Sequence, residues 1–286
     1  SLDSAGAFHA IQVEESSRPL TAFSCPLGQF QFLRLPFGVT NGPSCYSRLV
    51  QKALGKLPEK FALAYIDDII IYSKDVRQHF RHLEDIVRIH AKVGMKLKLR
   101  KCKLFESQIK YLGYMVSERG ISMVDEYVDR ILDWQVPKLG TELRKFLGFA
   151  GYYRSFIPKY AELTADLESM KSQVEISWTD QAIKHFNDLK DHFKKAPTRG
   201  YPDYDSEHPF ILDTDFSSIA IAAVLSQVQN NAERFLGCVA RKTKDAESRY
   251  PSYKGELLAL VYALQKFEHI LVCRKFLLRT DSSPLK

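Results

Sequence analysis

The chain has 286 residues, of which 45% are hydrophobic and 26% are charged, and its formal net charge is +7. This composition is that of an ordinary folded protein, and the length accommodates two or three domains. No apolar run approaches the ~18 residues that a membrane-spanning helix needs, and no secretory signal pattern opens the chain, which argues against a membrane or exported protein.

The cysteines predict neither a disulfide framework nor a zinc site. All five are scattered along the chain, and no two of them form a CxxC pair. An odd number without such a pair fits a reducing compartment better than an oxidising one. The chain also begins with Ser1 rather than Met, so we expect a piece of a longer protein.

The N-terminal residues predict a strand that ends in an acid. Asp3 follows Leu2, and small residues from Ser4 to Ala7 precede the aromatic Phe8. Small side chains let another molecule approach the backbone closely. Taken alone, a loop that leads into a helix explains the same residues better.

The following segment predicts a hairpin, a loop and a helix. Alternation of apolar and polar residues between Thr21 and Leu35, interrupted by Pro and Gly, predicts the hairpin. The composition of residues 36–43 predicts a loop. A helix is then predicted from Cys45 to Lys56, with Pro58 as its stop signal.

The stretch Phe61–Tyr72 is the most informative part of the chain. Two short apolar runs rich in Ile, Leu and Tyr flank Asp67 and Asp68, which predicts a tight hairpin of two buried strands with two carboxylates at its tip. Asp is common in turns, so an ordinary turn explains the pair without any function. Clustered acids indicate a site only when other features agree.

A helix is predicted from Val76 to Val93, because apolar residues recur there at helical spacing. It carries His79, His82 and His90. Their spacing allows a zinc site, but Cys or carboxylate partners are missing, so we expect surface histidines.

Six basic residues cluster just after the acidic hairpin. They are Lys92, Lys96, Lys98, Arg100, Lys101 and Lys103. A basic cluster facing two acids is what a protein needs if it holds a polyanion while metal ions occupy the acids. A solvated connection between a helix and a strand explains these charges equally well.

The middle of the chain predicts a short hairpin and then a helical region. Residues 109–116 form the hairpin, centred on Gly113, and residues 124–195 form the helices. The expected breaks between helices lie at Pro137, Gly140, Pro158 and Ser172. Thr179 is the expected N-cap of the last helix, which runs to Lys195.

Three aromatic residues gather around Arg154 in the helical region. They are Tyr152, Tyr153 and Phe156. Aromatic side chains beside an Arg are able to stack on bases or sugars, but such a run more often belongs to the core.

The Pro- and Gly-rich stretch Ala196–Asp203 predicts a linker, beyond which a separate unit begins. The predicted strands of that unit are Phe210–Asp215, Ile219–Gln227, Glu233–Ala240 and Phe276–Asp281, and its predicted helix is Tyr253–Leu271. Asp215 and Asp281 end strands, and Glu256 lies near the start of the helix. Three carboxylates at one edge of a sheet indicate a metal-dependent phosphodiester site.

In this order, the motifs resemble the Pol polyprotein of gypsy-type LTR retrotransposons and, more distantly, of retroviruses. The resemblance covers essentially the whole chain and corresponds to a reverse transcriptase followed by ribonuclease H. The matching motifs are Leu2-Asp3 with Phe8, Leu35–Asn41 with Pro43, Tyr65–Asp68, Tyr111–Tyr114, Phe146–Gly148, Gly151–Ile157, Thr214-Asp215, Glu256–Ala259 and Thr280-Asp281.

This resemblance implies an α+β fold in three parts. Residues 1–117 would form a right-hand polymerase palm, an antiparallel sheet plus helices, with partial fingers. Residues 118–196 would form a helical thumb or connection region. Residues 197–286 would form an RNase H-like α/β domain that is incomplete at its C-terminus, because its fourth acidic position is absent.

The implied activity is that of an RNA-directed DNA polymerase, a nucleotidyltransferase that uses two Mg²⁺ or Mn²⁺ ions per active site. The implied catalytic metal ligands are Asp3, Asp67 and Asp68 in the polymerase site and Asp215, Glu256 and Asp281 in the RNase H site. Hard cations of this kind take carboxylate oxygens as ligands.

The resemblance also implies a set of substrate-binding residues: Ala7, Phe8, Phe37, Gly38, Tyr65, Leu112 and Gly113. Phe8 resembles the family's aromatic residue that lies under the sugar and would clash with a 2′-hydroxyl, which favours dNTPs. Phe37 and Gly38 belong to a loop near the incoming nucleotide and the template. Leu112 and Gly113 belong to the element that holds the primer end.

The implied partners are an RNA or DNA template with its primer, an RNA–DNA hybrid, dNTPs and other Pol segments such as a protease and an integrase. No membrane partner is implied. The expected location is intracellular, in a cytoplasmic retroelement particle, with the nucleus as an alternative.

Several residues depart from the family pattern. Gly255 stands where a Lys commonly precedes the Glu, Ser282 stands where a His commonly follows the Asp, and Phe216 and Ala222 replace an Ala and a Gly. The alternative function is therefore a catalytically inactive nucleic-acid-binding fragment, which Mg²⁺-dependent synthesis would distinguish. A third hypothesis, structural acids in an unrelated α/β protein, does not explain the order of the motifs.

Overall fold

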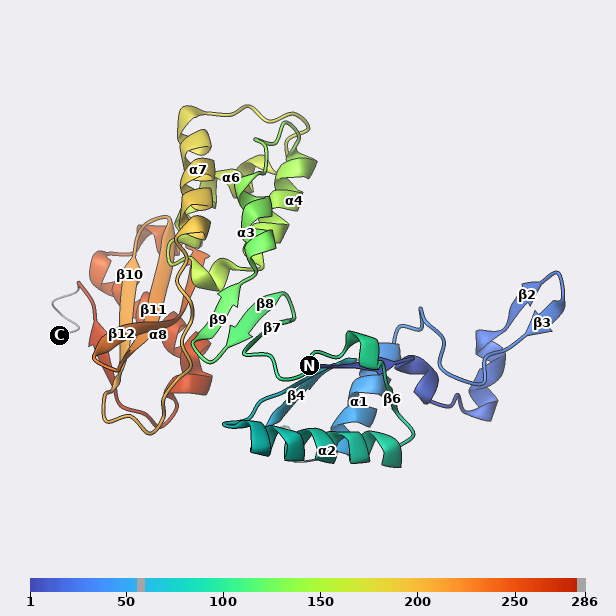
Figure 1. Cartoon of the computed structure of the whole chain (residues 1–286). Coiled ribbons are helices and arrows are strands. Elements are labelled where there is room, and N and C mark those ends of the chain that lie inside the picture. Colours follow the sequence, from blue (N-terminus) through green and yellow to red (C-terminus); the bar gives the residue numbers. More distant parts are fainter. Residues whose placement is uncertain (56–59, 282–286) are drawn as a thin grey trace. The chain divides into compact units, whose positions relative to one another are not determined.

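The computed structural model describes residues 1–55 and 60–281 and divides into two compact units, Ser1–Tyr111 and Leu112–Lys286 (Figure 1). Each unit combines helices with a sheet that is wholly or mainly antiparallel, so the predicted α+β class is confirmed. Among the described helices, none is both long enough and apolar enough to cross a membrane.

The first unit combines a four-stranded sheet with further short strands and with helices. Its strands are β1 (Leu2–Ala5), β2 (Phe23–Cys25), β3 (Gly28–Phe30), β4 (Ala62–Tyr65), β5 (Asp68–Ile71), β6 (Lys96–Leu97) and β7 (Gln108–Tyr111). Its helices are α1 (Gly42–Leu54) and α2 (Val76–Lys92), with single turns of 3-10 helix at η1 (Phe8–Ala10) and η4 (Leu99–Lys101) and a longer 3-10 segment, η2 (Glu15–Thr21).

One apolar core holds the first unit together. Its four-stranded sheet has the order β4-β5-β1-β6. Leu2 from β1 and Ile69 from β5 are buried with Tyr46 and Val50 from α1 and Ile86 from α2. Each such side chain contributes roughly 1.5–3 kcal/mol on burial, so the apolar face of both helices fixes them to the sheet.

The predicted acidic hairpin is present, but only one of its strands is buried. β4 and β5 pair in the register Tyr65↔Asp68, which leaves Ile66 and Asp67 as a two-residue turn. Leu63 and Tyr65 are 49% and 57% exposed, because β4 is the edge strand of the sheet. The prediction of two buried strands was therefore wrong for β4.

Three other local predictions need correction. Asp3 lies within β1 rather than at its end, since the strand continues to Ala5. Helix α1 begins at Gly42 instead of Cys45, because Pro43 is tolerated in a first turn, where no backbone donor is required. The predicted end at Lys56 and the stop signal at Pro58 lie outside the described residues.

The prediction of surface histidines was wrong for His90. This side chain is 2% exposed, and its Nδ1 lies 2.8 Å from the carbonyl oxygen of Ile86 in the preceding turn of α2. His79 and His82 both approach the hydroxyl of Ser73, with Nδ1–Oγ distances of 3.0 and 2.8 Å.

The second unit contains a group of helices and a four-stranded sheet. Its elements are β8 (Tyr114–Ser117), β9 (Gly120–Met123), α3 (Asp125–Leu132), α4 (Gly140–Gly151), η5 (Arg154–Phe156), α5 (Tyr160–Leu163), α6 (Ala165–Met170), α7 (Asp180–Lys194), β10 (Phe210–Phe216), β11 (Ala220–Gln229), β12 (Ala232–Lys242), η6 (Glu247–Arg249), α8 (Ser252–Leu271) and β13 (Phe276–Arg279).

The helical part follows the predicted pattern. Thr179 caps α7, since its hydroxyl accepts a hydrogen bond from the Ala182 N–H at 3.2 Å. Tyr153 and Phe156 are each 1% exposed and lie in the same apolar core as Phe186 of α7. The core interpretation of the aromatic run is therefore confirmed for these two residues.

The sheet of the second unit has the order β12-β11-β10-β13, with β10 and β13 parallel and the other pairs antiparallel (Figure 1). All its predicted strands and its helix exist, with shifts of one to two residues at most ends. Leu212 of β10 and Ala263 of α8 are fully buried, so α8 packs against this sheet.

The Pro- and Gly-rich stretch around Arg199 is packed rather than free. Ile121 of β9 and Arg199 exchange two backbone hydrogen bonds of 2.8 Å each, and the N–H of Gly200 donates to the carbonyl of Phe235 in β12. The guanidinium of Arg199 donates to the Leu236 carbonyl at 3.0 Å and to the Ser155 hydroxyl at 3.2 Å. This segment therefore joins the helices to the sheet within one unit.

Gly120 is where this packing leaves no room for a side chain. A Cβ at this position would lie 2.1 Å from the carbonyl oxygen of Arg199, and the φ of Gly120 is +132°. We expect Gly120→Ala to lower the free energy of unfolding of the second unit by at least about 2 kcal/mol. Both tryptophans, Trp134 and Trp178, lie in this unit, so fluorescence during urea unfolding measures the change.

Gly148→Ala is the matched control for that experiment. Gly148 is exposed within α4, and a Cβ there meets nothing within 4 Å. Alanine is the better helix former, so this variant should gain roughly 0.5–1 kcal/mol. Equal effects of the two substitutions would contradict the close packing at Gly120.

Candidate active sites

The first unit brings three predicted acids to one end of its sheet. In the antiparallel pair of β1 and β5, Asp3 stands opposite Asp68. The N–H of Ser4 donates to the carbonyl of Asp67 at 3.2 Å, which ties the hairpin turn to β1. Backbone pairing therefore places Asp3, Asp67 and Asp68 close together although the chain separates them widely.

The turn that carries Asp67 is strained. Ile66 has a φ of 52°, in the left-handed region that β-branched residues rarely adopt. Such strain costs of order 1–3 kcal/mol and persists only where the surroundings enforce it, most often at functional sites. The backbone geometry thus supports a role for the adjacent acid.

Crowding of negative charge is evident at Asp68. Partial desolvation, followed by the charges of Asp67 and Asp3, raises the pKa of Asp68 above its ordinary value. Desolvation and the charge of Asp68 also raise the pKa of Tyr111 to about 12. A cation placed among these carboxylates would relieve the repulsion.

One cation already contacts this group. The ammonium Nζ of Lys101 lies 3.3 Å from Oδ2 of Asp3. The contact follows from the backbone, since Ser4 pairs with Leu97 of β6 and the Lys98 N–H donates to the Asp3 carbonyl at 2.8 Å. Part of the basic cluster, from Lys96 to Lys101, therefore runs beside the strand that carries Asp3.

The predicted substrate residues of the first unit lie near each other only in part. Phe8 meets Phe37 edge-on at 5.3 Å and Tyr46 at 6.0 Å between ring centroids. Ala7 is buried, whereas Tyr65 is 57% exposed on β4. Gly38 has a φ of +92° with open space around its Cβ position, so this loop residue is accessible.

Leu112 and Gly113, the predicted primer-holding residues, belong to the second unit. They form the two-residue turn that precedes β8, with φ angles of 47° and 77°. Tyr152 and Tyr153 from the end of α4 contact this turn.

The second unit brings the other three acids to one edge of its sheet. β10 and β13 run parallel, with Asp213 level with Arg279, so Asp215 and Asp281 both follow the paired segment. Together with Thr280 these residues line an open depression of about 550 Å³. Glu256 comes from α8 and is only 5% exposed.

Glu256 is held in a fixed position by neutral donors. Its carboxylate accepts hydrogen bonds from the Phe216 N–H and, at 3.4 Å, from the Thr280 hydroxyl. Burial, followed by the nearby charge of Asp215, raises the pKa of Glu256 despite these bonds. The sheet edge thus holds a buried acid between two exposed ones.

Two departures from the family pattern fit each other in space. A Cβ on Gly255 would lie 2.2 Å from ring atoms of Phe216, so the aromatic ring occupies the place of any side chain at position 255. The large residue at 216 and the missing side chain at 255 are therefore one coupled feature.

Divalent cations fit the donor chemistry of both acid groups. Within residues 1–55 and 60–281, no group of three or more His, Cys, Asp or Glu side chains converges tightly enough to hold a metal ion by itself. Mg²⁺, however, is usually bound by one or two carboxylates together with substrate phosphates. Desolvation, followed by the charge of neighbouring carboxylates, raises the pKa of Asp68 and of Glu256, and a cation would neutralise that neighbouring charge.

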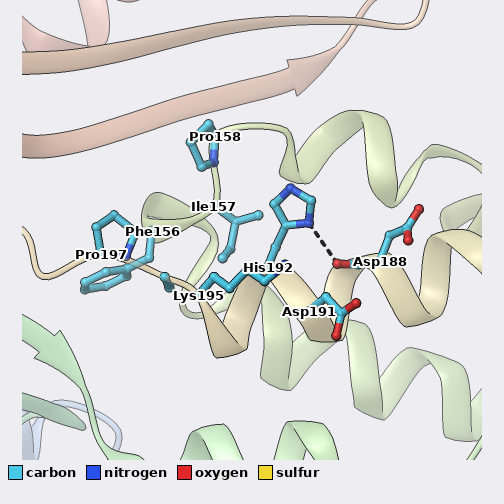
Figure 2. Close-up of a pocket in the computed structure, with 9 residues that line it drawn as sticks. Phe156, Ile157, Pro158, Asp188, Asp191, His192, Lys195 and Pro197 are labelled. Atoms are coloured by element: carbon cyan, nitrogen blue, oxygen red, sulfur yellow. Dashed lines mark hydrogen bonds between the residues drawn. The ribbon is translucent and has the colours of Figure 1, made fainter.

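Another concavity of the second unit contains none of the predicted site residues (Figure 2). It has a volume of about 310 Å³ and is lined by Phe156, Ile157, Pro158, Asp188, Asp191, His192, Lys195, Ala196 and Pro197. Figure 2 shows the ring of His192 turned to its own helix, where Nδ1 lies 2.8 Å from the Asp188 carbonyl. None of the predicted site residues lines it, so we place no active site there.

Some residues of these sites were not predicted as such. The sequence indicates Lys101 only as part of a basic cluster, and Thr280 and Tyr111 only as parts of motifs. Their partners are Asp3, Glu256 and Asp68, each far away in the sequence. No spacing rule identifies such contacts before the strand register is known.

Family comparisons agree with this arrangement. Residues 1–116 match the family described as reverse transcriptase (RNA-dependent DNA polymerase), and residues 178–278 match the RNase H-like domain found in reverse transcriptase. The retrovirus-related Pol polyprotein from transposon 297 of Drosophila melanogaster is 35% identical over 100% of this chain. The transposon Tf2-3 polyprotein of Schizosaccharomyces pombe is 32% identical over 94% of it. The chain spans only 26% and 20% of these relatives.

Solved structures show the same fold. The foamy viral protease-reverse transcriptase in complex with an RNA/DNA hybrid matches 98% of this chain with a TM-score of 0.83 and 21% identity, over 38% of its own length. The same viral protein in complex with double-stranded DNA matches 99% of the chain with a TM-score of 0.85 and 21% identity, over 59% of its length. A polymerase palm followed by an RNase H-like domain is therefore the fold of this chain.

The raised pKa of Glu256 predicts a pH-dependent gain of stability on removing its charge. The folded protein holds the proton more tightly than the unfolded chain, so the ionised carboxylate destabilises the fold increasingly from about pH 4.3 up through the raised pKa. We expect Glu256→Gln to raise the free energy of unfolding at pH 7 and to have little effect near pH 4. Urea unfolding in EDTA, followed by tryptophan fluorescence, measures both.

Glu233→Gln is a control of opposite sign. Hydrogen bonds from Ser226 and Arg279 lower the pKa of Glu233, so its charge stabilises the fold above the ordinary glutamate pKa. This variant should lose stability at pH 7, and the loss should shrink as the pH falls. A stability gain for Glu256→Gln that is independent of pH would show that charge is not the cause.

Proposed function

This chain belongs to the reverse transcriptase and RNase H region of retrotransposon Pol polyproteins, and we propose that it acts as an RNA-directed DNA polymerase with an attached RNase H-like domain. The observation that carries the proposal is the cluster of Asp3, Asp67 and Asp68 at one end of the β1–β5 pair. Divalent cations would relieve the repulsion between carboxylates that lie so close together, and nucleotide transfer by a two-metal mechanism uses such cations.

In this proposal Asp3 and Asp67 are the main ligands of two Mg²⁺ or Mn²⁺ ions, and Asp68 completes the site. When bound, such ions lower the pKa of the primer 3′-hydroxyl and neutralise the charge of the pyrophosphate leaving group. The chain itself contributes the fixed strand register that holds the carboxylates together. Lys101, now paired with Asp3 at 3.3 Å, becomes free to contact a phosphate once the acids are neutralised.

Selection of dNTPs is assigned to Phe8. Its ring meets Tyr46, which is fully buried in the core, and Phe37, which is 69% exposed, both edge-on. These contacts support a ring position that would block a 2′-hydroxyl. Ala7, Phe37, Gly38 and Tyr65 are proposed to contact the nucleotide or template, as in the resemblance.

For the RNase H-like domain we propose Asp215, Glu256 and Asp281 as the acids that hold two divalent ions. The depression of about 550 Å³ beside Asp215 and Asp281 is open enough for a nucleic-acid backbone. The substrate would be the RNA strand of an RNA–DNA hybrid, recognised by shape and 2′-hydroxyls.

The proposed division of roles follows residues 1–117 for the palm, 118–196 for a thumb or connection, and 197–286 for the RNase H-like domain. The proposed partners are primer–template, dNTPs and other Pol segments such as a protease and an integrase. A cytoplasmic particle is the proposed location, and the nucleus is the alternative.

A second function, nucleic-acid binding without cleavage, is favoured for the RNase H-like domain by one observation. The ring of Phe216 fills the place beside Glu256 where the family commonly carries a Lys side chain at position 255. The cationic side chain that the family commonly carries at position 255 is therefore missing from this domain.

The test of polymerase activity is primer extension on a poly(rA)/oligo(dT) hybrid with dTTP and Mg²⁺ or Mn²⁺. Asp67→Asn should reduce extension at least about 100-fold, because a site that depends on charge loses a ligand. Asp85→Asn, at an exposed position of α2, should leave extension unchanged. Hybrid binding without any extension by the unmodified chain would instead favour the inactive binding fragment.

Sugar discrimination is a separate prediction. We expect Phe8→Val to raise the kcat/KM for rNTPs relative to dNTPs at least about tenfold, because the steric block over the 2′ position is removed. Phe80→Val is the control, since Phe80 is 60% exposed on α2 and is not a predicted substrate contact. Unchanged discrimination in Phe8→Val would remove Phe8 from this role.

A further inference from the structure

Two neighbouring tyrosines bind the two carbonyls of one turn. The hydroxyl of Tyr152 donates to the Leu112 carbonyl at 2.6 Å, and that of Tyr153 donates to the Gly113 carbonyl at 2.7 Å. The donors come from the end of α4, and the acceptors lie 40 residues earlier in the chain. Consecutive side chains thus recognise consecutive peptide groups.

The turn requires such support. Leu112 and Gly113 both have positive φ angles, 47° and 77°. Two-residue turns of this kind strongly prefer Asn-Gly, and a Leu in the first position is strained. Without outside partners, this backbone would relax to another shape, so the hydroxyls fix a conformation that the local sequence does not favour.

Other contacts position both tyrosines. Tyr153 is 1% exposed in the helical core, whereas Tyr152 is 51% exposed and stacks on Tyr114 at 5.2 Å between centroids. The hydroxyl of Tyr114 in turn donates to the Tyr152 carbonyl at 3.3 Å. The two hydrogen-bond donors are therefore positioned before any ligand arrives.

Gly113 suits the turn through its backbone conformation. A Cβ there would lie 3.4 Å from the ring of Tyr152 and 3.6 Å from the hydroxyl of Tyr153, which are ordinary contact distances. The positive φ of 77° is what favours a glycine at this position.

We propose that the hydroxyls of Tyr152 and Tyr153 are positioning groups that hold the Leu112–Gly113 turn in the shape in which it contacts the primer strand. This inference rests on the proposed polymerase function and on the family resemblance, which implies that Leu112 and Gly113 hold the primer end. The tyrosines act through the turn, so their loss should weaken primer–template binding and leave the use of dNTPs by bound complexes unchanged.

The experiment uses the full chain with Tyr152→Phe and Tyr153→Phe, singly and together. Phenylalanine keeps each ring and removes only the donor. Tyr160→Phe is the matched control, because Tyr160 also donates to a backbone carbonyl, that of Leu147 at 3.4 Å, in the same unit and outside the turn. Hydrogen exchange of the peptides that cover residues 112–114 measures the shape of the turn.

Binding is measured as the Kd for an oligo(dT)/poly(rA) hybrid in EDTA, so it does not depend on catalysis. We expect the double variant to exchange faster at residues 112–114 and to bind the hybrid about tenfold more weakly, with the KM for dTTP within about twofold in active preparations. Tyr160→Phe should change neither the hydrogen exchange at residues 112–114 nor the Kd for the hybrid.

Unchanged hydrogen exchange at residues 112–114 in the double variant would overturn the proposal that the hydroxyls hold the turn. Faster exchange with an unchanged Kd would overturn the role of the turn in primer binding. An equal loss of affinity in Tyr160→Phe would also overturn it, by showing a general effect on stability. Failure of the unmodified chain to extend a primer is a different result, which counts against the proposed polymerase activity. The Kd and hydrogen-exchange measurements still decide whether the tyrosine hydroxyls hold the turn.

Discussion

The antiparallel pairing of β1 with β5 is the constraint on which the first unit depends. It sets Asp3 opposite Asp68 and lets Ser4 bind the carbonyl of Asp67, so backbone hydrogen bonds hold like charges together that would otherwise separate. A shift of one residue in this register would send the acids to opposite faces of the sheet. Buried Leu2 and Ile69 prevent the shift, since it would also move them out of the core.

The two groups of carboxylates are stabilised by different surroundings. In the first unit all charge is near solvent, and Lys101 offsets part of it at Asp3. In the second unit Glu256 is buried, and uncharged donors, the Phe216 N–H and the Thr280 hydroxyl, hold it. The neutral donors lower the pKa of Glu256 only in part, so burial and the charge of Asp215 keep it raised, whereas Asp3 has a charged partner in Lys101.

The local spacing of apolar residues in the sequence predicted most of the helices and strands, because both follow short-range periodicity. It also located the acids, since Asp67 and Asp68 interrupt apolar strands. It did not predict what depends on long-range contacts. Arg199 appeared to lie in a linker because Pro and Gly surround it, yet its guanidinium and backbone bind three other segments. His90 appeared to lie on a surface because histidines usually do, yet it lies one turn from Ile86 on the buried face of α2.

The contact between Phe216 and Gly255 restricts the order in which this region could have changed. With the ring of Phe216 in place, a Cβ at position 255 would lie 2.2 Å from it, so a larger residue there requires a smaller residue at 216 first. That order, a smaller residue at 216 before a larger one at 255, passes through a stage with a gap beside Glu256 rather than a collision. A gap is tolerated more readily than overlap with a rigid ring. The present pair is therefore reached and left through the same intermediate, a smaller residue at 216 beside Gly255, so the two positions are bound to change in a fixed order.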